Sequence, residues 1–144
     1  MQRTRVVVVS DAHINSTVGL CPPSVNLDDG GTYRYSVQQR ALWRSWLDFC
    51  EKAHDSTDNV IVILNGDLVE NGNKSTQVIS RNKASILGMA YDAIAPLVED
   101  ADKVFVIRGT EYHTGSSADL EEAFAKDLSN VVPYKKKIYI RGGI

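Results

Sequence analysis

The chain has 144 residues, a formal net charge of −2 and 43% hydrophobic residues. This length fits one domain spanning 1–144, and the charge gives no reason to expect nonspecific nucleic-acid binding, although a nucleic acid could still be a substrate. The four valines near the start are too few for a signal peptide or a membrane span, so we expect a cytoplasmic protein with no membrane partner. Cys21 and Cys50 do not make a disulfide framework and are expected to be free thiols.

Apolar runs in chain order predict four strands. They are rich in β-branched residues and lack polar alternation, which is the pattern of strands buried on both faces of a parallel sheet. The runs are Val6–Val9, Val60–Leu64, Val104–Ile107 and Lys137–Ile140.

Residues 15–35 show no periodicity, so we predict a long structureless loop there. Such loops in compact domains are usually functional or disordered. The segment begins two residues after His13, and a loop covering a substrate is preferred to a passive insertion. Arg34 and Arg40, near its end, are candidate contacts for an anionic substrate, although exposed arginines usually have no such role.

Helical patterns separate the strands. Ser36 and Gln39 form a predicted capping box, followed by an apolar stripe. A second helix is expected from about Ser80 to Leu97, with Pro96 kinking or ending it. A third follows Ser117. The stripe of the first helix consists of Leu42, Trp43, Trp46, Leu47, Cys50 and Ala53, and that of the third consists of Leu120, Ala123, Phe124 and Leu128. The alternation predicts an α/β fold, a layered and mostly parallel sheet flanked by helices.

Short polar motifs follow three of the predicted strands. They are Asp11-Ala12-His13, Gly66-Asp67 and Gly109-Thr110-Glu111-Tyr112-His113. If the strands are parallel neighbours, the motifs meet at the sheet edge where open α/β sheets bind ligands. Buried carboxylates repel each other, and a metal ion is the simplest way to compensate them. A mixed Asp/His set suits a divalent transition metal. In Asp11-x-His13, an extended backbone would point both side chains the same way.

The three motifs resemble those of the calcineurin-like metallophosphoesterases, with the third similar to a Gly-Thr-Glu-x-His form found in phage-borne members. The resemblance implies a partial α/β/β/α sandwich and one or two divalent ions (Mn, Fe, Zn or Ni). It implies that Asp11 and His13 hold the first ion, that Asp67 bridges, and that Glu111 or Thr110 takes the place of an Asn ligand. His113 would protonate the leaving group or steady the transition state. A phage origin would place the protein in the host cytosol.

Two ions about 3.5–4 Å apart can activate a water and neutralise phosphoryl oxygens, so we predict a metal-dependent phosphoesterase acting on a phosphomonoester or phosphodiester. The family also has later His ligands, which this chain lacks. We therefore expect a shortened or incomplete member, and a catalytically silent metal-binding or assembly module is the alternative. His54 is expected to be a surface or capping residue. The strand at 137–140 is expected to leave a sheet edge open, which predicts a homodimer formed through an exposed edge.

Overall fold

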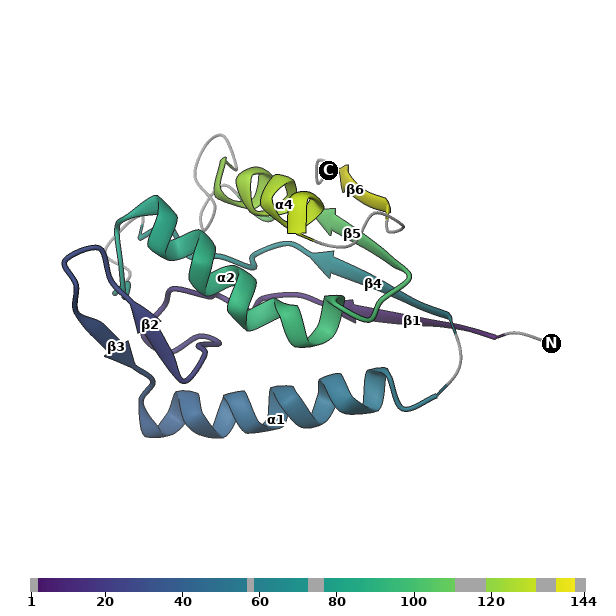
Figure 1. Ribbon diagram of the computed structural model, residues 1–144, viewed down its shortest axis with the longest axis horizontal. Helices are drawn as coiled ribbons and strands as arrows, with labels where there is room; N and C mark the ends of the chain where they lie inside the picture. Colours follow the sequence, from purple (N-terminus) through teal and green to yellow (C-terminus); the bar gives the residue numbers. More distant parts are fainter. Residues whose placement is uncertain (1–2, 57–58, 73–76, 111–118, 132–136, 142–144) are drawn as a thin grey trace.

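The computed structural model describes residues 3–56, 59–72, 77–110, 119–131 and 137–141. Its centre is a parallel sheet of β1 (Thr4–Val9), β4 (Asn59–Asn65), β5 (Lys103–Ile107) and β6 (Lys137–Arg141). The spatial order is the chain order, β1-β4-β5-β6, and each neighbouring pair is parallel (Figure 1). The predicted α/β class with a parallel sheet is confirmed.

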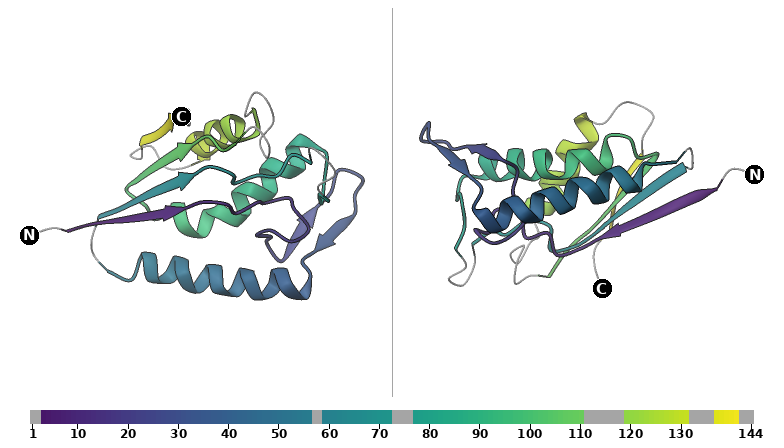
Figure 2. Two further views of the ribbon diagram at one scale, coloured as in Figure 1. Left: turned by 180° about the vertical axis from the view of Figure 1, so that it is seen from behind. Right: turned by 90° about the horizontal axis from the view of Figure 1, so that it is seen from below.

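The helices α1 (Val37–Ala53), α2 (Lys83–Val98) and α4 (Asp119–Val131) lie on one face of the sheet, with α2 between the other two (Figure 2). This follows from the strand order. Each crossover moves to the next strand on the same side, and right-handed crossovers then place every helix on the same face.

The prediction that the strands are buried on both faces is wrong for β1. Val7, which points toward the helices, is 8% exposed, but Val6 and Val8 are 54% and 57% exposed. Their register partners on β4, Ile61 and Ile63, are only half-buried. Helices cover one face only, so alternate side chains of each strand point to the other face.

Helix α1 begins as predicted. Ser36 caps it, its side chain accepts from the Gln39 N–H, and the Gln39 side chain accepts from the Ser36 N–H in return. Of the predicted stripe, Trp43, Trp46, Cys50 and Ala53 are buried. Leu42 and Leu47, by contrast, are 43% and 39% exposed, because no element described in the structure packs against those flanks.

Helix α2 begins later and ends later than predicted. Its cap is Asn82, whose side chain accepts from the Ser85 N–H, and Pro96 lies within its last turn. The helix continues through Pro96 because Leu97 and Val98 are completely buried and hold the final turn in the core. Helix α4 lies where it was predicted, with Phe124 and Leu128 buried.

Residues 15–35 are not a structureless loop. They contain the antiparallel hairpin of β2 (Ser24–Asn26) and β3 (Thr32–Arg34), and Leu20, Cys21 and Val25 join the core. Sequence reasoning missed these two strands because each has only three residues, too few to show a periodic pattern. The two cysteines are free and buried, and burial raises the pKa of each thiol to about 11. Across the described ranges, no helix is both long and apolar enough to traverse a membrane.

Candidate metal centre

The turns that follow β1 and β4 run side by side beyond the carboxyl edge of the sheet. The backbone N–H of Asp11 donates to Gly66 O over 3.2 Å, and that of His13 donates to Asp67 O over 3.1 Å. The Ile14 N–H then donates to Leu68 O over 2.8 Å. The parallel pairing of the strands therefore continues into the turns and places the Asp11-x-His13 motif beside Asp67, as the sequence predicted.

These two turns have an unusual backbone. Asp11, His13, Asn15 and Asp67 have φ angles of 57°, 45°, 81° and 50°, and they are the non-glycine residues with positive φ in the part of the chain that the structure describes. L-residues rarely adopt this region, and such strain concentrates at functional sites. The extended backbone assumed for Asp11 and His13 was therefore wrong, since both residues are left-handed.

The His13 imidazole lies between two carboxylates. Its Nε2 is 3.7 Å from Asp11 Oδ1, and its Nδ1 is 3.7 Å from Glu70 Oε2. Glu70 is 2% exposed, whereas the Asp11 side chain is largely in solvent. Metal-binding histidines commonly orient one ring nitrogen toward a carboxylate and the other toward the ion. Sequence reasoning missed Glu70; its only signal was an acidic residue in an otherwise apolar stretch three positions after Asp67.

The third turn, after β5, contacts Asp67 directly. Oδ1 of Asp67 accepts from the Thr110 N–H over 2.7 Å and from Thr110 Oγ1 over 3.0 Å. A Cβ on Gly109 would lie 2.3 Å from both the backbone nitrogen and Oδ1 of Asp67, so only glycine allows this approach. Gly66, with φ of 77°, sits opposite Gly109 in the same contact.

Glu121 of α4 ties two of the turns together. It is 1% exposed, and its two carboxylate oxygens accept from the backbone N–H groups of Leu68 and Gly109. Burial raises the pKa of Glu121, and the two N–H donors partly oppose that rise. The sequence indicated only an acidic residue in the first turn of a helix, where acids are common.

Asn15 makes a similar brace inside the fold. Its side chain is completely buried, donates to the carbonyls of Glu70 and Ser80, and accepts from the Ser80 N–H. These bonds join the turn after β1 to the segments before α2. Sequence reasoning gave Asn15 no role, because nothing local marks a buried Asn.

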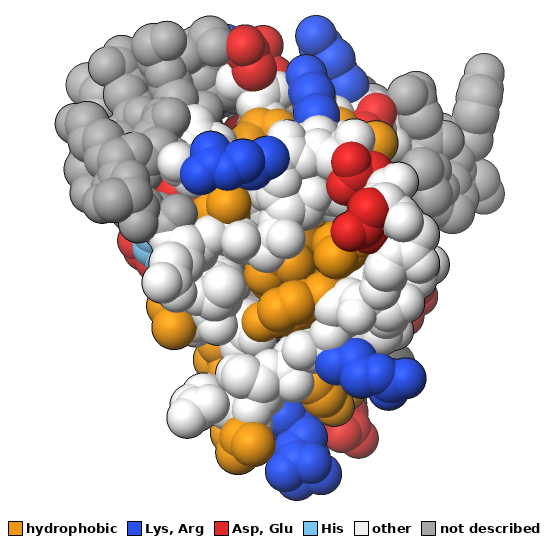
Figure 3. All heavy atoms as spheres, turned by 90° about the vertical axis from the view of Figure 1, so that its left-hand side faces the viewer, with side chains coloured by type: hydrophobic (Ala, Val, Ile, Leu, Met, Phe, Trp, Pro, Cys, Tyr) orange, Lys and Arg blue, Asp and Glu red, His pale blue; other side chains and the backbone are white. Residues whose placement is uncertain are grey.

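The structure describes some of the other predicted site residues and not others. Glu111 and His113 lie outside the described residues. Arg34 on β3 and Arg40 on α1 are exposed, and within the described ranges no hydrogen bond or ion pair joins either side chain to the turns. His54 caps α1 as expected, with Nε2 2.8 Å from Leu97 O. Figure 3 shows the end of the molecule that bears the hairpin, where Lys and Arg side chains are scattered around a hydrophobic centre.

The side chains of the described residues do not complete a metal site. Asp11 and His13 supply one pair of donor atoms, but within the described ranges no three His, Cys, Asp or Glu side chains are arranged so that they could hold one ion. The chain matches none of the protein-family models, curated proteins or solved structures with which it was compared.

Proposed function

We propose that the protein is a metal-dependent phosphoesterase that hydrolyses a phosphomonoester or a phosphodiester. The observation that carries this proposal is the unusual backbone conformation that Asp11, His13 and Asp67 have in common. All three residues have positive φ and lie in two hydrogen-bonded turns at the carboxyl edge of a parallel sheet. Strain of this kind persists when the surrounding structure imposes it, and it concentrates at ligand sites.

In this proposal Asp11, His13 and Asp67 hold the ion, with Mn, Fe, Zn and Ni as candidates, and Glu111 adds a ligand. A bound ion would supply an activated water and neutralise phosphoryl charge. The buried Glu70 carboxylate orients the His13 ring from Nδ1. The hydrogen bonds from Thr110 fix Oδ1 of Asp67, and Oδ2 keeps lone pairs for a ligand. His113 would act toward the leaving group.

A second candidate is a catalytically silent metal-binding or assembly module that keeps the fold. It is favoured by one observation: within the described ranges, no three His, Cys, Asp or Glu side chains are placed to hold the ions that hydrolysis would need. The two candidates differ in turnover, so a paired measurement of metal content and hydrolysis separates them.

The test combines elemental analysis with hydrolysis of bis-p-nitrophenyl phosphate in Mn²⁺ or Zn²⁺. We expect about one tightly held divalent ion per chain, and metal-dependent hydrolysis that is lost in Asp67→Asn. Asp48→Asn, at an exposed position of α1, is the control and should keep full activity. Unchanged hydrolysis in Asp67→Asn would show that the phosphoesterase assignment is wrong. Stoichiometric metal without hydrolysis would favour the silent module.

A further inference from the structure

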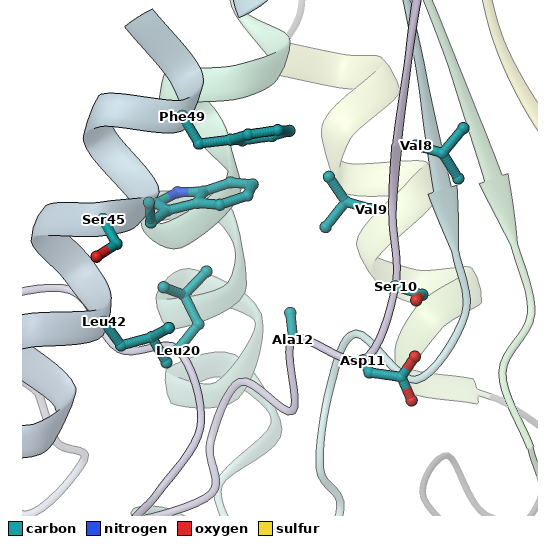
Figure 4. A pocket seen from close by; sticks show the side chains of 10 residues that line it. Val8, Val9, Ser10, Asp11, Ala12, Leu20, Leu42, Ser45 and Phe49 are labelled. Carbon is teal, nitrogen blue, oxygen red and sulfur yellow. The ribbon is translucent and has the colours of Figure 1, made fainter. Parts of the chain in front are cut away.

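An open pocket of about 410 Å³ lies between α1 and β1. Its walls are mainly apolar, with Leu42, Trp46 and Phe49 on the helix side and Val9 on the strand side. Figure 4 shows Phe49 and Val9 pointing toward one another across it. The Trp46 and Phe49 rings are stacked, with centroids 5.7 Å apart and planes at 25°, so the helix side presents a rigid aromatic wall.

The pocket exists because α1 is anchored to α2. The Trp46 Nε1–H donates to Ala93 O over 2.8 Å, and His54 Nε2 contacts Leu97 O at the far end of the helix. Strand β1 is held separately, by its pairing with β4 at one edge of the sheet. Two elements fixed by different partners leave the space between them open.

The pocket ends at the turn that carries the candidate metal ligands. Ser10, Asp11 and Ala12 line it at that end. In Figure 4 the Ala12 side chain points into the pocket, while the Asp11 carboxylate points to the other side of the turn. Asp11 is the one charged residue among those that line the pocket, and it is acidic. Among the residues that the structure describes, no Lys, Arg or His lines the pocket to pair with an anionic group, so an uncharged apolar group is favoured inside.

The size and exposure of the pocket indicate the kind of group that fills it. A cavity of about 150 Å³ can hold benzene, so 410 Å³ has room for one ring or two fused rings. Leu42 and Phe49 are 43% and 41% exposed, and covering them with an apolar group removes that surface from water.

We propose that this pocket binds an aromatic group of the phosphoester substrate, while the phosphate lies at the turn bearing Asp11 and His13. The substrate class is then an aryl or similarly flat, apolar phosphoester. This inference rests on the proposed phosphoesterase function for the position of the phosphate, but the pocket itself can be tested separately.

The experiment compares phenylphosphonate with methylphosphonate by isothermal titration calorimetry in Mn²⁺. Both carry the same anionic group and neither has an ester bond to hydrolyse, so a difference in affinity reports the ring. We expect phenylphosphonate to bind at least about tenfold more tightly. Ser45→Tyr, at an exposed position that lines the pocket, should fill it and reduce the difference to below about twofold. Leu47→Tyr, exposed on the same helix but outside the pocket lining, should keep the full difference.

Equal affinities of the two ligands, undetectable binding of phenylphosphonate, or equal effects of the two Tyr variants would overturn the inference. Repeating the titration in EDTA distinguishes failure of the pocket assignment from failure of the proposed metal-dependent function. If Ser45→Tyr still selectively weakens phenylphosphonate but Mn²⁺ makes no difference to binding, the pocket assignment holds and the metal-dependent phosphoesterase does not.

Discussion

Asp67 and Thr110 are joined by two hydrogen bonds to one carboxylate oxygen, although they are 43 positions apart in the chain. The backbone N–H and the hydroxyl of Thr110 both donate to Oδ1 of Asp67. The turn after β5 thus fixes the carboxylate for which the family resemblance implies a bridging role. This contact is possible only because Gly109, the preceding residue, has no side chain.

Gly109→Ala should destabilise the protein by about 1–3 kcal/mol, because the new methyl group must displace the backbone of Asp67 or its carboxylate. Thermal unfolding followed by circular dichroism measures the change. Gly88→Ala is the matched control. Nothing lies within 4 Å of a Cβ at Gly88, which is inside α2, so the same substitution should stabilise by about 0.5–1 kcal/mol. Equal effects at both positions would contradict the close packing of the two turns.

Glu121 should make stability depend on pH. Its pKa is raised in the folded protein above its ordinary value of 4.5. At pH values between 4.5 and the folded pKa, the folded protein therefore keeps a proton that the unfolded chain has released. The stabilisation linked to this proton is fully present below pH 4.5 and is lost as the pH rises through the folded pKa. Urea unfolding between pH 4 and 7 should show the free energy of the wild type falling relative to Glu121→Gln. Asp119→Asn, exposed on the same helix, should follow the wild type.

Glu121→Leu should lower stability at pH 7 by about 1–3 kcal/mol, because the backbone N–H groups of Leu68 and Gly109 then lose their acceptor. Urea unfolding of this variant at pH 7 provides this value. A variant as stable as the wild type at pH 7 would show that the carboxylate does not brace the two turns.

Glu70→Gln should weaken divalent-metal affinity by about 10–100-fold, because the His13 ring loses the carboxylate that faces its Nδ1. Calorimetric titration with Mn²⁺ or Zn²⁺ measures the effect. Glu51→Gln, an exposed carboxylate on α1, controls for the loss of one negative charge and should bind as the wild type does. Identical affinities in both variants would show that Glu70 does not support the proposed metal site.

The face of the sheet opposite the helices should drive self-association. Val6 and Val8 are more than half exposed there, and β1 and β6 are the edge strands of the sheet. Exposed apolar edge strands pair readily with other chains. We expect a concentration-dependent dimer by light scattering over a dilution series, and Val8→Lys should shift it toward monomer. Val37→Lys, 69% exposed on α1, should leave the dimer unchanged. A monomer at every concentration would contradict this proposal.

The sequence predicted the strands and helices well wherever one run of residues decides the structure. The capping box at Ser36, the strand after Asn59 and the stripe of Phe124 and Leu128 depend on local patterns. Sequence reasoning failed where the burial or extent of an element depends on residues far away in the chain. The exposure of Val8 depends on all helices lying on the other face, and Pro96 is tolerated because Leu97 is held in the core.

The candidate site shows the same division. The motifs placed Asp11, His13 and Asp67 in adjoining turns, because parallel strands fix where their ends meet. Glu70 and Glu121 could not be found this way, because their importance arises from burial and from backbone groups far along the chain.

The link from Glu121 to Leu68 also bears on the order in which the molecule forms. The hydrogen bond spans 53 positions, so the turn that carries Asp67 receives this brace only after β5 and α4 have formed. Contacts between distant residues form slowly, because a long loop must close before they are made. During synthesis, β1, α1 and β4 can therefore assemble before the turns that bear Asp11 and Asp67 acquire their final geometry. We expect the native shape of this edge to be among the last features to appear in refolding and the first to be lost when α4 detaches.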